Sequence, residues 1–169
     1  MRFQKDEKRR SDRKLWIGTS GWVYPHWRGV FYPQGLATTR WLAYYVEHFP
    51  TVELNNTFYR FPTEKALQGW RDNVPQGFCY AVKVNRYLTH LKKLQGIEKS
   101  LERFLDALRL LGDKLGPLLH QLPPYWGCNV SRLRAYLSLL PGDLRHVFEF
   151  REPSWLNDEV FDLLAAEGM

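Results

Sequence analysis

Four charged residues lie within or directly after apolar, β-rich segments, where charged side chains are uncommon. They are Glu53, Lys83, Glu149 and Arg151. Two carboxylates and two cations gathered at one place would shift one another's pKa values, which suits proton transfer. We therefore predict a catalytic site in which one of the carboxylates is the acid or base and the two cations stabilise charge. A buried ion-pair network that only holds the sheet together is an equally good interpretation.

Hydroxyl, amide and aromatic side chains accompany these charged residues along the chain. Such groups could hydrogen-bond to, or stack on, a small polar or phosphorylated, sugar-like ligand. Capping of loops and strands is the alternative role for the amides, and core packing is the alternative for the aromatic rings. The predicted ligand-binding residues are Thr19, Ser20, Trp22, Asn55, Thr57, Tyr59, Arg60, Asn85, His90 and Gln121.

A turn flanked by glycines, residues 18–21, is a further candidate for anion binding. Its backbone N–H groups could hold a phosphate with help from Arg60, Arg86 or Arg151, although tight turning is the more frequent role of such glycines. The sequence has neither a P-loop nor a dinucleotide-binding glycine motif, so we predict no nucleotide cofactor. We also predict no metal, since no zinc-binding motif occurs, although His90 could join the two carboxylates as a ligand.

Five short segments rich in β-forming residues alternate with amphipathic segments and must position these side chains. The predicted strands lie near residues 15–17, 51–54, 78–82, 117–119 and 146–150. Apolar residues at helical spacing occur between them. These stripes are Trp41, Leu42, Tyr45, Val46 and Phe49, then Leu101, Phe104, Leu105, Leu108 and Leu111, then Val130, Leu133, Leu137 and Leu140. Strands that alternate with helices predict a parallel sheet.

Residues typical of helix starts agree with these segments. Thr38 or Thr39 is a predicted N-cap, and so is Asn157. Pro62 and Thr63 predict the start of a further short helix between the second and third strands. Each helix is therefore expected to connect one strand to the next.

Two architectures fit five such units. An open flavodoxin-like sheet has five strands at about this length, whereas a closed (β/α)₈ barrel needs about 250 residues. Polar residues at alternate strand positions favour the barrel, because one face of each barrel strand points into a lumen. Both faces of an open sheet are instead covered by helices. We predict an α/β fold that is a TIM-like (β/α) barrel, incomplete, with an open flavodoxin-like parallel sheet as the alternative.

Eight segments, in order along the chain, carry motifs of a known family. They are Ile17–Trp22, Trp27–Pro33, Val52–Arg60, Ala81–Lys83, Leu88–His90, Leu111–Pro117, Gln121–Pro124 and Phe148–Arg151. Together they closely resemble the YecE-like family, known as domain of unknown function 72. The resemblance covers about residues 15–168. It implies a TIM-like barrel, and it implies no particular reaction because the family has no assigned activity.

The spacing of the repeats predicts that the barrel is incomplete. Units begin at Trp16, Thr51, Cys79, Leu118 and His146, which are 35, 28, 39 and 28 residues apart. Eight units at this spacing need about 260 residues. We therefore expect residues 15–169 to form the N-terminal portion of a single barrel domain that lacks its last three strands. The open edges are expected to favour association and to lower stability.

Positive charge is concentrated at the start of the chain. Residues 1–14 hold seven basic and three acidic residues, in a chain with a formal net charge of +6, which predicts a basic mobile tail. Such a tail can touch phosphates, but nucleic-acid binding is not expected to be the function. Two cysteines, no long apolar run and no signal peptide indicate a cytoplasmic protein without a membrane segment. Three functions fit: an enzyme acting on a small molecule, a non-catalytic module that binds an anion or a partner, and an inactive fragment.

Overall fold

The computed structural model describes residues 15–169, and the predicted basic tail, residues 1–14, lies outside the described residues. The described chain forms a five-stranded sheet whose neighbouring strands are all parallel. The strands are β1 (Gly18–Ser20), β2 (Thr51–Leu54), β3 (Cys79–Lys83), β4 (Leu115–Gln121) and β5 (His146–Glu149). The predicted parallel sheet is confirmed, although β1 lies just after the segment, residues 15–17, in which it was expected.

The strands are adjacent in the order in which they follow one another along the chain, β1-β2-β3-β4-β5. A flavodoxin-like sheet would have its first strand between the second and the third, so that alternative is wrong. Within the part of the chain that the structure describes, β1 and β5 are the two edges of the sheet.

Helices connect consecutive strands, as predicted. They are α2 (Trp41–Tyr45), α3 (Asn56–Tyr59), α4 (Glu64–Asp72), α5 (Glu98–Leu108), α6 (Val130–Leu137) and α7 (Asp158–Ala166). The predicted caps Thr63 and Asn157 are confirmed, because each side chain accepts a hydrogen bond from a backbone N–H of the first turn. The predicted cap at Thr38 or Thr39 is wrong, because both lie within a 3₁₀ turn that follows the extended residue Ala37. Over residues 15–169, no helix has the length and apolar character needed to cross a membrane.

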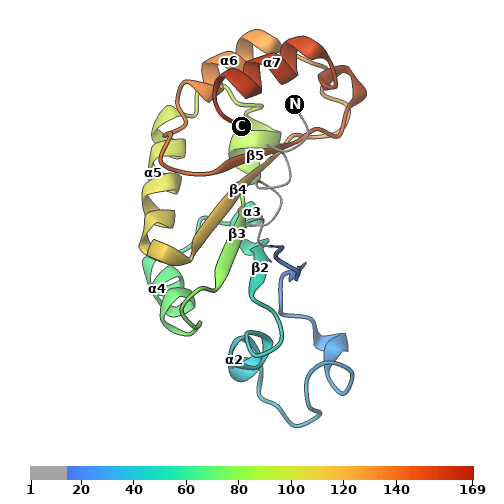
Figure 1. Ribbon diagram of the computed structural model, residues 1–169, viewed down its shortest axis with the longest axis vertical. Coiled ribbons are helices and arrows are strands. Elements are labelled where there is room, and N and C mark those ends of the chain that lie inside the picture. Colours follow the sequence, from blue (N-terminus) through green and yellow to red (C-terminus); the bar gives the residue numbers. More distant parts are fainter. Residues whose placement is uncertain (1–14) are drawn as a thin grey trace, which may run out of the picture.

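Alternate strand residues give the sheet two different faces. Buried apolar residues such as Leu54 and Val82, which are neighbours in the register, form one face. Figure 1 shows α4, α5, α6 and α7 arranged around one side of the sheet, where they cover such residues. Glu53, Lys83 and Glu149 have the opposite parity in the strand registers. They therefore share the face that points away from these helices.

The side chains of Glu53, Asn55 and Thr57 do not lie along one strand face, because only Glu53 belongs to β2. β2 ends at Leu54, and Asn55 has helical backbone angles (φ −92°, ψ −21°) before α3 begins. Asparagine is depleted in strands, and the short polar side chains of Asn and Thr readily bond to nearby backbone groups. Glu53 therefore stays on the strand, whereas Thr57 is buried in the following helical turn.

The segment between β1 and β2 packs aromatic rings against the start of the sheet. The rings of Tyr32 and Trp41 stack with centroids 4.5 Å apart and planes 8° from parallel. The Tyr45 hydroxyl accepts a hydrogen bond from the N–H of Thr19 (2.9 Å) and lies 3.0 Å from the carbonyl oxygen of Thr51. These bonds join the short strand β1 to β2, and they hold the carboxyl end of β1 in place.

Candidate functional site

The carboxyl ends of β4 and β5 hold a carboxylate in a defined position. Gln121 lies opposite Glu149 in the register, and its amide nitrogen lies 2.8 and 2.7 Å from the two carboxylate oxygens of Glu149. The Arg151 guanidinium lies 3.8 Å from the same carboxylate. The side chains of Glu149 and Arg151 are 41% and 50% exposed, so a solute can reach them. The structure thus brings three of the predicted site residues together.

A second group lies at the end of β3, around the ring of Phe58. The Lys83 ammonium is 5.0 Å from the ring centre, which is a cation–π distance. The His90 imidazole stands edge-on to the same ring, with centroids 4.9 Å apart. The Thr89 hydroxyl lies 2.9 Å from Nδ1 of His90. Phe58 and Thr89 therefore hold a lysine and a histidine in fixed positions near the strand end.

The charges around His90 show that the two groups act on each other. Burial lowers the pKa of the His90 imidazole below its ordinary value. The positive charges of Lys83, Arg151 and Arg86 lower that pKa further. Glu149 opposes them with a smaller effect. The lowered pKa favours the neutral imidazole, and charged residues on or just after β3 and β5 act on it.

An unusual backbone segment carries His90. Residues Tyr87–Leu91 form a π-helix, which is rare and occurs frequently at functional sites. Lys93 and Leu94 follow with φ values of 47° and 67°, a region that is costly for residues other than glycine. The N–H of Leu94 donates to the carbonyl oxygen of Leu88 at 2.9 Å and holds this turn in place. The chain therefore maintains a strained conformation directly beside His90.

Glu53 belongs to a separate group at the ends of β1 and β2. The Ser20 hydroxyl lies 3.3 Å from its carboxylate, and the Asn55 amide donates to the Ser20 hydroxyl. Ser20 and Glu53 border a cavity of about 430 Å³ on the face of the sheet that points away from the helices. Among residues 15–169, no ion pair joins Glu53 to a cation. Glu53 thus lies apart from the groups that hold Lys83, Glu149 and Arg151, although it shares a sheet face with Lys83 and Glu149.

Thr57 and Asn85 have structural roles instead of open ligand positions. The fully buried Thr57 hydroxyl lies 2.8 Å from the carbonyl oxygen of Leu54 and 2.7 Å from that of Lys83. The Asn85 amide donates to the carbonyl oxygen of Thr57 at 2.7 Å, and its oxygen accepts from the N–H of Tyr87 at 2.9 Å. These bonds fasten the loop after β2 to the loop after β3, which is the capping alternative for Asn85.

Residues 18–22 have fewer free hydrogen-bonding groups for a ligand than their glycines suggest. Residues 18–20 are strand β1, and the N–H of Thr19 already donates to Tyr45. The Thr19 hydroxyl donates to the carbonyl oxygen of Gly21 at 2.7 Å. Trp22 is buried and packs edge-on against Trp70, with centroids 6.1 Å apart. The Thr19 N–H and hydroxyl are therefore already bonded within the protein, and Trp22 has a packing role.

Tyr59 and Arg60 are exposed residues at the end of α3. Tyr59 is 65% exposed, and its ring meets Phe58 edge-on at 5.1 Å. Arg60 follows it and is also exposed. Tyr59 thus lies beside the Phe58 ring that contacts Lys83, and a ligand could reach it from solvent.

The residues that could have held a metal do not gather. Glu53 bonds to Ser20, whereas the Glu149 carboxylate is engaged by Gln121. His90 is oriented by its neighbour Thr89. Across the described range, residues 15–169, no group of three or more His, Cys, Asp or Glu side chains is placed to hold a metal ion.

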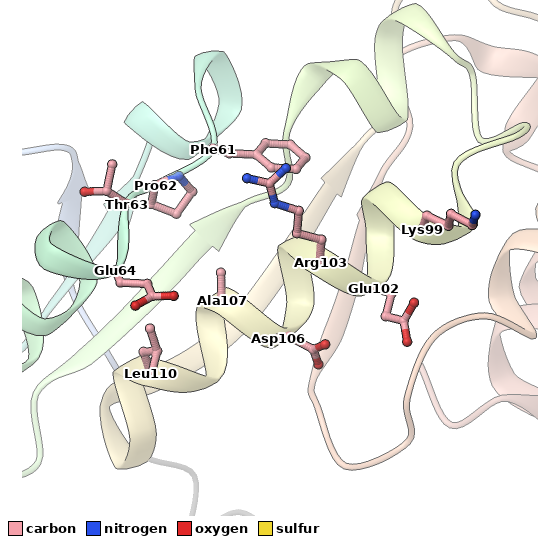
Figure 2. Close-up of a pocket in the computed structure, with 10 residues that line it drawn as sticks. All are labelled: Phe61, Pro62, Thr63, Glu64, Lys99, Glu102, Arg103, Asp106, Ala107 and Leu110. Atoms are coloured by element: carbon pink, nitrogen blue, oxygen red, sulfur yellow. The ribbon is translucent and has the colours of Figure 1, made fainter.

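A larger cavity than the one beside Glu53 lies away from the strand ends. It has a volume of about 610 Å³ and lies between the start of α4 and one side of α5. Figure 2 shows Lys99, Glu102, Arg103 and Asp106 projecting from successive turns of α5 along it. Charges of both signs on the outer surface of a helix are typical of a solvated face, so this cavity is the weaker candidate.

Two residues of the site were given no direct binding role by the sequence. Phe58 was not among the predicted ligand-binding residues, yet its ring contacts both Lys83 and His90. Arg86 was expected only to assist the turn at residues 18–21, but its charge acts on His90. Both follow strand ends and adjoin predicted ligand residues in the sequence. That position is the signal by which they could have been found.

Comparisons with known proteins show relatives that are longer than this chain. The UPF0759 protein YunF of Bacillus subtilis (strain 168) is 29% identical, over 91% of this chain and 58% of that protein. A DUF72 family protein from Thermotoga maritima MSB8 has a similar crystal structure, with a TM-score of 0.76 at 28% identity over 91% of this chain and 62% of that one. One from Enterococcus faecalis V583 has a TM-score of 0.68 at 23% identity, over 88% of this chain and 55% of the other. The chain therefore spans about 55–62% of the length of these relatives.

A family model connects these similarities to the sequence. The model described as "Protein of unknown function DUF72" matches residues 16–169, which is nearly all of the described chain. The resemblance drawn from the eight sequence motifs is thereby confirmed. The chain belongs to the DUF72 family of proteins of unknown function.

Proposed function

We propose that the carboxyl ends of β3, β4 and β5 form the active site of an enzyme that acts on a small polar substrate by acid–base chemistry. The observation that carries this proposal is the Glu149 carboxylate, which Gln121 and Arg151 hold at an exposed strand end. The charges of Lys83 and Glu149 both act on the pKa of the His90 imidazole, in opposite directions. A fixed carboxylate beside cations and a neutral imidazole is an arrangement suited to proton transfer.

The proposed roles follow from what each group can do at neutral pH. Glu149 is the acid or base, because its carboxylate is half exposed and oriented. Lys83 and Arg151 stabilise negative charge that develops on the substrate. Glu53 would serve a substrate that extends along the sheet toward the cavity beside Ser20.

We further propose that the sheet is part of a TIM-like barrel. Support comes from the sequential parallel strand order and from the helices on one side. The chain also covers only 62% of its solved Thermotoga relative, which leaves length for further units. In such a barrel the face that bears Glu53 and Lys83 would line the lumen, and active sites form at the carboxyl end of the strands. The activity of this chain alone would then be partial or absent.

A non-catalytic binding module is the second candidate. The Gln121 amide lies within hydrogen-bond distance of both Glu149 oxygens, so the carboxylate is already engaged. An engaged carboxylate exchanges protons less readily than a free one, and it can serve only to orient Arg151 for a ligand. Binding without turnover would then be the function of the same residues.

Turnover measurements on matched variants test the proposal. A panel of small polar metabolites is screened with the wild type, with Glu149→Gln and with Glu159→Gln, a control at an exposed position of α7. Loss of a general acid or base lowers turnover about 10²- to 10⁴-fold, so Glu149→Gln should lose activity while the control retains it. Equal turnover by Glu149→Gln and the wild type would contradict the assignment. Binding without turnover by the wild type would favour the binding module.

A further inference from the structure

We infer that the ligand of this site carries a phosphate-type anionic group, held by Lys83, Arg86 and Arg151 beside His90. The inference names the substrate class of the site proposed above, so it rests on that location. It does not depend on catalysis, because an anion can bind there whether or not a proton is transferred.

The balance of charge around His90 is the first argument. Lys83 and His90 contact the same Phe58 ring, and the Arg151 guanidinium lies 3.8 Å from the Glu149 carboxylate. The charges of Lys83, Arg86 and Arg151 act on the imidazole, and Glu149 is the carboxylate that opposes these three cations. An excess of positive charge at a partly desolvated strand end favours an anion.

The rigidity of the cluster is the second argument. Phe58 contacts both the Lys83 ammonium and the His90 ring, so both lie on one aromatic support. The Thr89 hydroxyl orients the imidazole, and the π-helix after β3 carries it. Donors that are held in place before binding lose less conformational entropy when an anion arrives. A solvated surface patch of flexible lysines would lack this support.

The types of donor point to a phosphate. A guanidinium presents planar paired N–H groups that match the oxygens of a phosphate or carboxylate, and an ammonium adds a point charge. The neutral His90 contributes a ring nitrogen that can donate or accept one hydrogen bond. Two guanidinium groups and an ammonium exceed what a single carboxylate needs, whereas a phosphate has oxygens for all three.

Titration with inorganic phosphate, followed by NMR amide shifts, tests the inference. The wild type should show saturable shifts at residues 83–90 and 149–151. Lys83→Gln and Arg151→Gln should each weaken the affinity about ten- to hundredfold, since each removes a charge-assisted contact. Lys65→Gln, which removes an exposed cation from α4, is the matched control and should bind as the wild type does. Far-UV circular dichroism confirms that each variant is folded.

Several outcomes would overturn the inference. They are the absence of saturable shifts with phosphate, equal affinity in Lys83→Gln and the wild type, and an equal loss in Lys65→Gln. Acetate that binds as tightly as phosphate would also overturn it, because the ligand would then be a carboxylate. Glu149→Gln separates this inference from the proposed enzyme. If that variant keeps full turnover while phosphate binding still depends on Lys83 and Arg151, the anion site stands and the catalytic assignment fails.

Discussion

Lowering the pH should destabilise the protein through a buried chain of hydrogen bonds on the helix-covered face. His120 Nδ1 lies 2.7 Å from the Tyr136 hydroxyl, His120 Nε2 lies 2.9 Å from His146 Nδ1, and His146 Nε2 lies 3.1 Å from the carbonyl oxygen of Pro141. A carbonyl only accepts, so His146 must donate to Pro141 and accept from His120. His120 must in turn accept from Tyr136. When both rings are neutral, each hydrogen bond in this series has one donor and one acceptor. A further proton on His146 Nδ1 would place two N–H donors opposite each other.

The size of the effect follows from the two pKa shifts. Burial holds the pKa of His120 well below its ordinary value, and His146 lowers it further. Burial also lowers the pKa of His146, while its bond to Pro141 and the charge of Asp143 partly oppose this. The unfolded chain therefore binds more protons than the folded chain below an ordinary pKa of about 6.5, and stability falls as the pH drops. Between pH 7.5 and 5.5 the loss is about 1.4 kcal/mol for His120, with a smaller loss for His146.

Urea unfolding at pH 7.5 and 5.5, at constant ionic strength, measures this difference. The wild type should lose about 1–3 kcal/mol of unfolding free energy over this range, with a contribution of the same sign from His90, whose pKa is also lowered. His146→Asn keeps an oxygen that can accept from His120 but cannot titrate, so its pH dependence should be smaller. His26→Gln, at an exposed position, is the control and should match the wild type. Equal stability of the wild type at the two pH values, or a pH dependence that is as small in His26→Gln as in His146→Asn, would refute the reasoning.

Substitutions at four further positions test the elements around the site, each by urea unfolding. Thr57→Val removes a buried hydroxyl that lies between two backbone carbonyl oxygens and should cost about 1–3 kcal/mol; no loss would contradict the structural role. Asn157→Ala removes the N-cap bond of α7 and should cost about 1 kcal/mol, whereas Asn157→Asp should cost less. Gly18→Ala would place a Cβ atom 2.1 Å from the carbonyl oxygen of Thr51 and should cost about 1–3 kcal/mol. Gly69→Ala, which meets no atom within 4 Å in α4, should stabilise by about 0.5–1 kcal/mol.

Local periodicity predicts a helix or strand that has one apolar side. It fails where a tertiary contact determines the backbone conformation. The alternation of Val52 and Leu54 with polar residues predicts β2, because burial follows the same alternation. The pattern cannot show that the strand ends at Leu54, since Asn55 and Asn56 are compatible with a strand end or a helical turn. The Thr57 hydroxyl, bonded to the carbonyl oxygen of Lys83, favours the turn. That partner lies 26 residues away, beyond the reach of a local pattern.

The candidate site was predictable in its residue types and less so in its grouping. Glu149 and Arg151 are two residues apart, so a shared side follows from strand geometry alone. The contact of Gln121 with Glu149 depends on the register of β4 against β5, which local sequence does not report. The separation of Glu53 from Glu149 arises because three strand pairings lie between β2 and β5. The sequence could therefore name these residues but could not divide them into two groups.

The two faces of the sheet satisfy their polar groups differently, and this difference supports the proposed location of the site. On the helix-covered face, His120 and His146 use their ring nitrogens on each other and on neighbouring protein groups, so a ligand has nothing left to bind. On the other face, Lys83 and Glu149 keep capacity for a solute at the strand ends. The groups proposed to hold an anion come from β3, β5 and the segments that follow them, all within this chain. Phosphate binding should therefore persist in this chain even if turnover requires the further strands of a complete barrel.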